Sequence, residues 1–567
     1  MASPDNDVAF DRIMEMVGDD GPFQKRYNLI YNVLAVLVFG MTVVNILLVL
    51  TVPDHNCIVP GRELYNVTSE DRWKNLTLPR ELNNRGESGF SSCRMYNLSK
   101  YADGATPPDQ WAFLPNETTS CRYGYEYDRE YFDRTPVTEQ DWVCEKELHP
   151  TNVFAFIRFG EVSGTFVLGQ LGDRIGRLPV YLISLAMGAL GRALAVFTAP
   201  YYGLFALLAL VGSFASNTGF QSPLIVAMEI SKDENRASLS MWQLGGWTVG
   251  ICAAPLLLWW GRDWVWLLLG TSLPLLVFYC LPQYNIESPR WLAGQGRYPE
   301  CIRMLRKIAK VNGKRFDMTV EELQQKAPRK EFEKMYGIVS LFSGSHMAKL
   351  TGLLLVGWIC NTIPTFTLIL LSTQMGGNPF MNFFWQGAIE LPAYLCGQVL
   401  CDRIGRRWTN SVAFLFNALS CVPVILTIHQ PGTELLTSIF AVVIKFFVCV
   451  TYFALYLQSF EVYPTLLRQT GTSFGIIVAN IFGAAGPYIV FLGTSFDIRL
   501  PFVVMMLIGL LGFVTSIFLP ETLYQKLPDT MDEGRRFGKN QRFWTMPKRP
   551  RGERAQHPGE VEKLNQS

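Results

Sequence analysis

Long apolar segments recur along most of this chain, and one polar pentapeptide stands twice between them. Asp173–Arg177 and Asp402–Arg406 both read Asp-Arg-Ile-Gly-Arg and lie 229 positions apart. Each copy ends one apolar segment and begins another, so each predicts a tight polar loop between two membrane helices. Two further pairs keep nearly the same offset, Glu229 with Glu461 and Arg236 with Arg468. The sequence therefore predicts two duplicated halves.

The composition indicates an integral membrane protein. Of the 567 residues, 49% are hydrophobic and only 17% are charged, which is too apolar for most soluble proteins. The formal net charge of +2 gives no indication of a nucleic-acid partner. Residues 1–25 are polar and acidic without a basic leader segment, so we expect no cleaved signal peptide.

The apolar segments predict an all-α membrane protein with twelve spans in two sets of six. We expect the spans at 27–51, 152–172, 179–198, 202–228, 237–260, 264–283, 348–372, 379–400, 409–428, 435–457, 470–492 and 500–519. The predicted regions are a leader (1–26), an N-terminal bundle (27–283), an amphipathic linker (284–347), a C-terminal bundle (348–519) and a disordered basic tail (520–567). Lysine and arginine concentrate in the linker, the twin loops and the tail, so these sides and both termini are predicted to be cytoplasmic.

The polar insert at 52–148, inside the N-terminal bundle, has the features of an extracellular loop. It holds four cysteines, Cys57, Cys93, Cys121 and Cys144. It also holds four Asn-x-Ser/Thr sequons, at Asn66, Asn75, Asn97 and Asn116. An even number of cysteines beside several sequons indicates an oxidising, glycosylated compartment. The spacing leaves the disulfide pairing open, because four cysteines allow three connectivities.

The twin loops are predicted to take part in gating. An aspartate there can pair with an arginine or a helix N-terminus, and such a contact can form in one conformation and break in another. Gly164, Gly169 and Gly172 are expected to let helices approach closely near the first copy. The predicted gating residues are Asp173, Arg174, Gly176, Arg177, Asp402, Arg403, Gly405, Arg406, Glu229, Arg236, Glu461 and Arg468. The alternative for the last four is that they are separate surface charges.

Several motifs carry a resemblance to a known family. Gly169–Arg177 resembles the signature loop of the major facilitator superfamily. Motifs similar to those of the organic cation, carnitine and organic anion transporter family are Pro53–Cys57, Thr138–Cys144, Glu287–Leu292 and Glu461–Thr465 with Arg468. The resemblance implies two six-helix bundles around a central cavity, alternating access and a plasma-membrane location, and it is compatible with an invertebrate member. The second twin departs from the superfamily pattern, because Gln398 stands where a glycine is expected.

Glu390 is the most informative charge inside a predicted span. A charge at mid-membrane costs about 2.5–3.5 kcal/mol or more, which makes it a functional hypothesis by default. Glu390 lies 12 residues before Asp402, about 18 Å along a helix from the cytoplasmic end. It resembles an acidic residue that the family uses in cation handling. We expect Glu390 to attract the positive end of a substrate, and the alternative is a salt bridge to Lys445.

Helix 11 departs from the charged members of the family. Asn480 stands where cation members carry an aspartate and where anion or carnitine members carry an arginine. An amide can donate and accept hydrogen bonds but fixes no charge preference. Tyr394 stands where anion members carry a lysine, while Lys445 remains a candidate partner for a carboxylate. This combination favours a zwitterion or an amino-acid-like amine.

Two aromatic residues and one charge pair complete the candidate site. By resemblance, Trp358 and Phe220 match aromatic positions of cation members, and their rings can face an ammonium. Ordinary packing is the alternative for each ring. Arg158 and Glu161 lie three residues apart on one helical face, where they either satisfy each other or take part in coupling and selectivity.

Other function classes lack their motifs. The sequence contains no phosphate-binding Gly-x-x-x-x-Gly-Lys-Ser/Thr loop for ATP, no catalytic constellation and no metal-ligand spacing among its five histidines. We therefore predict a secondary or facilitated transporter of small organic cations or zwitterions that is not an enzyme and has no cofactor or metal. Co-transported Na⁺ or H⁺, the oligomeric state and the substrate are left open. The alternatives are an organic anion exchanger and a receptor-like sensor that transports nothing.

Overall fold

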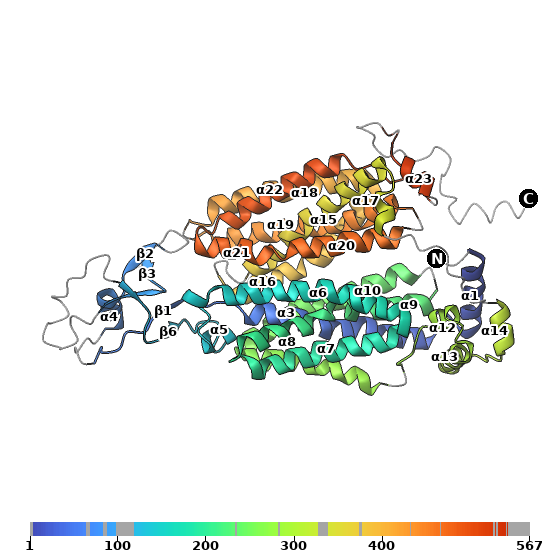
Figure 1. Ribbon diagram of the computed structural model, residues 1–567, viewed down its shortest axis with the longest axis horizontal. Coiled ribbons are helices and arrows are strands. Elements are labelled where there is room, and N and C mark those ends of the chain that lie inside the picture. Colours follow the sequence, from blue (N-terminus) through green and yellow to red (C-terminus); the bar gives the residue numbers. More distant parts are fainter. Residues whose placement is uncertain are drawn as a thin grey trace, which may run out of the picture.

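The computed structural model shows two bundles of helices lying side by side (Figure 1). It describes residues 4–63, 69–82, 88–97, 118–232, 235–281, 284–326, 338–372, 377–430, 432–464, 467–525, 528, 531–539 and 541. A strand-containing domain lies at one end of the bundles, which we call the loop end. Short helices lie at the other end, which we call the linker end.

The N-terminal bundle begins with three consecutive helical elements, in which α2 passes through the π-helical segment η1 into α3. Its elements are α2 (Pro22–Tyr27), η1 (Asn28–Leu34), α3 (Ala35–Val49), α6 (Leu148–Ile175), α7 (Arg177–Thr198), α8 (Tyr202–Phe214), α9 (Ser216–Ile230), α10 (Arg236–Gly261), α11 (Trp264–Ser272) and η6 (Leu273–Cys280). Gly176 separates α6 from α7 with a φ of +115°, a conformation in which a side chain is strained.

The C-terminal bundle repeats this plan. Its elements are α15 (Ser345–Leu371), α16 (Pro379–Ala388), α17 (Glu390–Ile404), α18 (Arg406–Thr427), α19 (Glu434–Val462), α20 (Arg468–Gly483), α21 (Gly486–Ser495) and α22 (Leu500–Ile517). Gly405 separates α17 from α18 with a φ of +93°, as Gly176 does in the first bundle. The twin loops are thus equivalent turns in two equivalent bundles.

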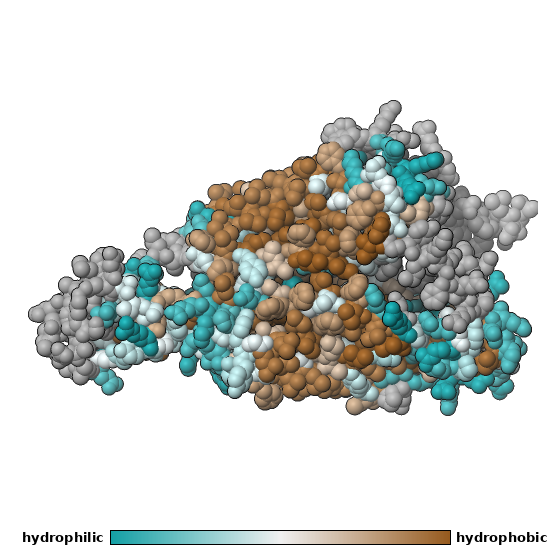
Figure 2. Space-filling view, in the orientation of Figure 1, coloured by the Kyte–Doolittle hydropathy of each residue, from teal (hydrophilic) through white to brown (hydrophobic). Residues whose placement is uncertain are grey.

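Nine helical segments of the described chain are long and apolar enough to cross a membrane. The other three predicted spans are helical as well. The segment Trp264–Cys280 is apolar but short, whereas α6 and the pair α16–α17 carry charged and amide side chains within their length. Figure 2 shows hydrophobic residues covering the flanks of both bundles and hydrophilic residues at the two ends. Large apolar side chains face outward, as a lipid environment requires, including Trp260, Phe197 and Leu435.

The loop-end domain consists of three two-stranded antiparallel sheets and short helices. The sheets pair β1 (His55–Cys57) with β6 (Tyr125–Tyr127), β2 (Arg80–Leu82) with β3 (Ser88–Phe90), and β4 (Arg94–Tyr96) with β5 (Thr118–Ser120). The helices are α4 (Glu70–Thr77), α5 (Pro136–Glu139) and the 3₁₀ turn η4 (Cys144–Lys146). Strands of three residues bury little apolar surface, so covalent cross-links are expected to contribute much of this domain's stability.

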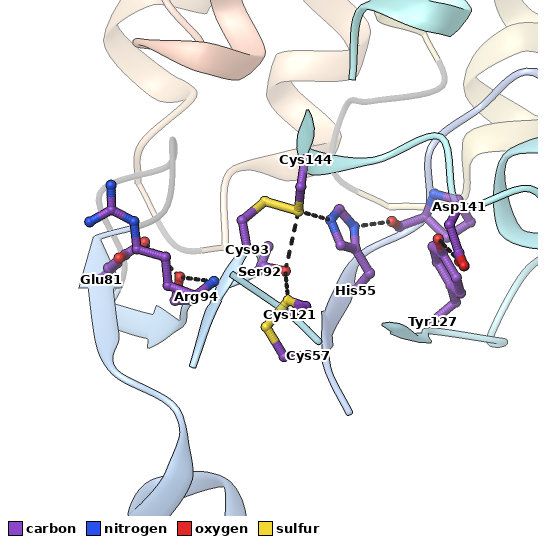
Figure 3. The surroundings of a disulfide bond; sticks show 12 residues. His55, Cys57, Glu81, Ser92, Cys93, Arg94, Cys121, Tyr127, Asp141 and Cys144 are labelled. Carbon is purple, nitrogen blue, oxygen red and sulfur yellow. Dashed lines mark hydrogen bonds between the residues drawn. A yellow bond between two sulfur atoms is a disulfide. The ribbon is translucent and has the colours of Figure 1, made fainter. Parts of the chain in front are cut away.

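Two disulfides supply these cross-links, and they decide the pairing that the sequence left open. Cys57 is bonded to Cys121, and Cys93 is bonded to Cys144. Figure 3 shows His55 beside the second bond, with its Nε2 3.8 Å from the Cys144 sulfur. His55, Cys93 and Cys144 are close enough to resemble a set of metal ligands. Both sulfurs are bonded to each other, however, and are therefore not thiolate ligands.

The short helices of the linker end pack mainly onto one bundle each. They are α1 (Pro4–Val17), α12 (Pro289–Gly294), α13 (Tyr298–Val311), α14 (Val320–Lys326), η7 (Ile338–Phe342) and α23 (Met531–Arg536). In the N-terminal bundle α12 packs on α9 and α13 on α2, and in the C-terminal bundle α23 packs on α15. The predicted disorder from residue 520 is wrong for the described part of the tail. Arg535 donates to the Ser343 carbonyl, and Gln541 exchanges two hydrogen bonds with the backbone of Glu521.

The bundles are joined in the half of the molecule nearer the loop end. There α6 packs against α20 and α21, and α10 packs against α16 and α17. Tyr488 on α21 donates to the Asn152 side chain on α6 across 3.1 Å. On the other side, the Cys252 sulfur of α10 lies 3.7 Å from the Phe384 carbonyl oxygen of α16. These contacts close the loop end of the interface between the bundles.

Candidate substrate site and gating charges

A buried ion pair lies in the C-terminal bundle. The Lys445 Nζ on α19 is 2.9 Å from the Glu390 Oε1, at the first residue of α17. Their side chains are only 1% and 9% exposed. The salt bridge that the sequence offered as an alternative therefore exists in this conformation. Each charge is compensated by the other, which is the condition for keeping both inside a membrane.

Two tyrosines lie close to this pair, since Tyr394 and Tyr452 both interact electrostatically with Glu390. Tyr394 follows Glu390 by one turn of α17, and its ring lies 6.3 Å from that of Tyr452 on α19. Tyr452 and Tyr456 are 41% and 43% exposed, although both belong to a helix that packs inside the bundle. Neither was singled out from the sequence. Their spacing of four residues puts them on the same face of α19 as each other, which is the signal that could have found them.

Trp358 supports these tyrosines from behind. Its ring is 2% exposed and lies edge-on to Tyr452 and Tyr456, with centroid separations of 5.6 Å and 6.5 Å. Its Nε1 donates to the Ser459 hydroxyl across 3.0 Å. A Cβ on Gly475 would lie 2.8 Å from the same ring, so α20 also closes over it. In this conformation the packing alternative describes Trp358, and the exposed aromatic surface belongs to Tyr452 and Tyr456.

Phe220 and Asn480 stand apart from the ion pair. Phe220 on α9 packs edge-on against Trp247, with centroids 5.1 Å apart, and its carbonyl accepts a hydrogen bond from Gln243. Asn480 is half-buried on α20. Within the described part of the chain, no hydrogen bond links Asn480 to Glu390 or Lys445. Of the six predicted substrate-site residues, the structure brings together Glu390, Lys445 and Tyr394.

The second intramembrane pair lies in the N-terminal bundle and reaches the other bundle. Arg158 Nη1 is 2.6 Å from Glu161 Oε2, and both side chains are buried. The Arg158 guanidinium carbon also lies 3.5 Å from the ring centroid of Phe366 on α15, a close cation–π contact. The interpretation that Arg158 and Glu161 only satisfy each other is therefore incomplete. One partner of the pair makes a contact between the bundles.

The two halves hold their twin turns in the same way. Glu287 accepts the backbone N–H groups of Arg177 and Leu178, at 2.9 and 3.1 Å, where α7 begins. Glu521 accepts those of Arg406 and Arg407, at 2.8 and 3.2 Å, where α18 begins. A carboxylate at a helix N-terminus satisfies free N–H groups and the helix dipole. Burial raises the pKa of Glu287, and the N–H groups that it accepts oppose that shift.

The predicted gating charges are engaged differently in the two halves. Arg406 holds Glu461 with two hydrogen bonds of 3.1 and 3.0 Å, and it lies 3.6 Å from Asp402. In the first half Glu229 is half-buried and lies near enough to Arg177 for the two charges to interact. Arg174 and Arg403 are exposed. The Arg468 guanidinium lies over Phe460. The side chains of Asp173 and Arg236 lie outside the described part of the structure.

Only one of the three glycines before the first twin is closely approached. A Cβ on Gly164 would lie 1.6 Å from the Phe214 carbonyl oxygen, so α6 and α8 touch there through backbone. Around Gly169 there is open space, and Gly172 has a single neighbour at 3.9 Å, from Arg177. The expected close helix contact at the linker end of α6 is therefore wrong for this conformation.

Two of the four predicted glycosylation sites lie among the described residues. Asn75 is exposed on α4, where its side chain donates to the Asp71 carbonyl and accepts from Arg80. Asn97 follows β4 and is half-buried. Asn66 and Asn116 lie outside the described residues.

A family model and several known proteins match this chain. The model described as "sugar (and other) transporter" matches residues 119–533, which is more than half of the sequence. The carcinine transporter of Drosophila melanogaster is 29% identical over 559 residues, which cover 96% of this chain and 82% of the relative. The β-alanine transporter of the same species is 30% identical over 554 residues, covering 93% and 89%. Organic cation/carnitine transporter 2 of Homo sapiens is 28% identical over 541 residues, covering 92% and 93%.

Proposed function

The chain belongs to the sugar (and other) transporter family of the major facilitator superfamily and is a transporter, not an enzyme, and we propose which substrates it carries and by which mechanism. We infer that it moves small organic cations or zwitterions bearing an amine across the plasma membrane by alternating access. The relatives named for carcinine, β-alanine and carnitine support this class of substrate. In this proposal the loop end is extracellular, and the linker end and both termini are cytoplasmic.

The observation that carries the proposal is the buried pair of Glu390 and Lys445 beside the partly exposed Tyr452, which interacts electrostatically with Glu390. A substrate ammonium can take the place of Lys445 on the Glu390 carboxylate, because the two cations are chemically equivalent. The face of Tyr452 then offers a cation–π contact to the same group. In that exchange Glu390 keeps a positive partner, while Lys445 is released and can pair with a carboxylate of the same substrate.

The arrangement of the bundles supports an alternating-access cycle. Closure at the loop end, through α6 with α20 and α21 and through α10 with α16 and α17, corresponds to a state sealed toward the outside. The open space around Gly169 near the linker end supports the same assignment. In the opposite state the α6 surface around Gly169 and Gly172 closes against the C-terminal bundle. The capped turns at Gly176 and Gly405 keep their conformation and move together with their bundles.

Substitution of the carboxylate tests the proposed function. In cells that express the protein at the surface, we expect Glu390→Gln to lower uptake of radiolabelled β-alanine and carnitine at least tenfold. The reason is that Lys445 is then buried without a counter-charge and the substrate ammonium loses its partner. Glu434→Gln is the matched control, since Glu434 is an exposed carboxylate at the start of the same helix as Lys445.

The outcomes separate the candidate functions. Uptake of amines by Glu390→Gln at the wild-type rate would contradict the assignment of the site. Uptake of organic anions alone by the wild-type protein would favour an anion exchanger, and no uptake above vector-transfected cells would favour a receptor-like sensor. Repeating the assay without Na⁺ and at two external pH values identifies the driving force.

A further inference from the structure

The membrane interior of the N-terminal bundle contains one more positive than negative side chain. The charged residues there are Arg158 and Glu161 on α6 and Arg192 on α7. Arg192 was not singled out from the sequence, although it lies well inside a predicted span. In the C-terminal bundle the interior charges Glu390 and Lys445 cancel. The interior as a whole therefore carries one positive charge without a counter-charge.

Arg192 is the residue whose charge is left over. Its side chain is 1% exposed, and its guanidinium donates to the Ala209 carbonyl at 3.1 Å and to the Ser213 hydroxyl at 2.8 Å. Both acceptors are neutral, and the third nitrogen, Nε, is buried without a hydrogen-bond partner. Among the described residues, no carboxylate forms an ion pair with Arg192. Glu161 is near enough to act on it electrostatically but is bonded directly to Arg158.

One arginine of this charge cluster, Arg158, reaches the interface between the bundles. Arg158 rests on Phe366 of the opposite bundle, so α6 presents its end of the charge cluster to the C-terminal bundle. The other end of the cluster is Arg192, one helix deeper. A charge in a low-dielectric region acts over a longer distance than in water, so it needs no direct contact with a substrate. At about 10 Å and an effective dielectric constant of about 20, one charge changes a binding constant by roughly tenfold.

We propose that this positive charge makes the protein select substrates that carry a carboxylate in addition to their amine. The inference rests on the proposed transport function and narrows its substrate class to zwitterions. The amine is held at Glu390, while the potential from Arg158 and Arg192 favours a negative group on the same molecule and disfavours an uncompensated cation. Glu161 sets the strength of this selection by neutralising one of the two arginines.

The test compares two substrates that differ only in this charge. β-Alanine is a zwitterion, and β-alaninamide is a cation with the same backbone and amine. We expect the wild-type protein to take up β-alanine more efficiently, and Arg192→Met to lower the ratio of their uptake efficiencies roughly tenfold. Arg192→Lys keeps the charge and should keep the ratio. Glu161→Gln adds to the positive excess and should raise the ratio, which is the opposite direction.

Opposite shifts in the two variants distinguish selection from damage to the fold. A ratio is measured on one protein population, so lower surface expression cancels. If Arg192→Met and Glu161→Gln reduce uptake of both substrates equally, or shift the ratio in the same direction, the arginines are structural and the inference is overturned. If the wild-type protein takes up neither substrate, the proposed function fails first, and the selection that depends on it fails with it.

Discussion

The single residues that matter most in the described part of this protein are buried charges, some of which have an oppositely charged partner and some of which do not. Glu390 and Lys445 neutralise each other in the C-terminal bundle, whereas the hydrogen-bond acceptors of Arg192 are neutral groups. The two glutamates that cap α7 and α18 accept hydrogen bonds from the free N–H groups at the start of these helices. The loss of a partner costs more free energy in a membrane than in water, because no solvent is available to replace that partner.

Gly405 provides a prediction at this scale. Its φ is +93°, and a Cβ there would lie 2.3 Å from the Glu521 Oε2 that caps α18. Gly405→Ala should therefore strain the turn and displace the cap, at a combined cost of about 2–4 kcal/mol. Thermal unfolding of the purified full-length protein measures this cost as a lower midpoint. Gly432→Ala is the control, because Gly432 has a φ of +82° and open space where its Cβ would lie. Equal losses in the two variants would mean that the cap contributes nothing.

The elements of the molecule differ in what holds them in place. Most spanning helices are held by apolar packing, and their sequences are correspondingly hydrophobic. The exceptions are α6 and the pair α16–α17, which face the other bundle and carry three of the four charges of the two intramembrane ion pairs, the fourth being Lys445 on α19. In the loop-end domain the strands are too short to be stable by themselves, and they depend on two disulfides and a few buried side chains.

His55 in strand β1 makes this domain sensitive to pH. Burial against the Cys93–Cys144 disulfide lowers the pKa of His55 below its usual 6.5, and the Pro53 carbonyl only partly opposes this. The neutral form is therefore favoured in the folded state. Its contribution to stability is complete above pH 6.5 and is lost as the pH falls from 6.5 through the lowered value. We expect limited proteolysis within 52–148 to be faster at pH 5.5 than at pH 7.5.

His55→Gln removes the titrating group and should flatten this difference between the two pH values. Cleavage is followed on the full-length protein under oxidising conditions, with His557→Gln as the control because His557 is remote in sequence from the loop-end domain. A pH dependence of the same size in His55→Gln would assign the effect to another group.

At the scale of the whole molecule, the contact between the bundles determines which side is closed. Figure 1 shows the bundles as separate bodies of helices, and the described contacts between them lie on two sides, along α6 and along α10. Each contact contains a polar or charged group that can exchange partners, such as Arg158 over Phe366. Contacts of this kind are strong enough to hold one state and small enough to break during a transport cycle.

A disulfide across the α10–α16 contact should trap the protein in this closed state. A Cβ on Gly387 would lie 3.3 Å from the Cys252 sulfur, within the range of a disulfide between the two side chains. We expect Gly387→Cys to lose uptake on mild oxidation and to regain it on reduction. Gly387→Ala controls for the crowding of Ile251, and Gly387→Cys with Cys252→Ser controls for other thiols. Continued uptake by the cross-linked protein would show that α10 and α16 need not separate.

The membrane class, the two halves, the span positions and the location of Glu390 could all be predicted from the amino-acid sequence. These properties follow from local composition, hydrophobic length and a repeated motif, which are all written in consecutive residues. The sequence also predicted the disulfide-bearing loop, while the gating role expected of the twin turns stays a prediction. The span at α6 was found despite its charges, because the segment 152–172 is otherwise apolar.

Only the tertiary structure decided which side chains meet. The bond between Glu390 and Lys445, the pairing of the cysteines, the shielding of Trp358 and the exposure of Tyr452 depend on contacts between segments far apart in the chain. The lack of an ion-pair partner for Arg192 among the described residues likewise depends on such contacts, because the sequence shows that the charge is present but not which residue lies next to it. Partners are chosen by how helices pack, and many packings are compatible with the same apolar faces.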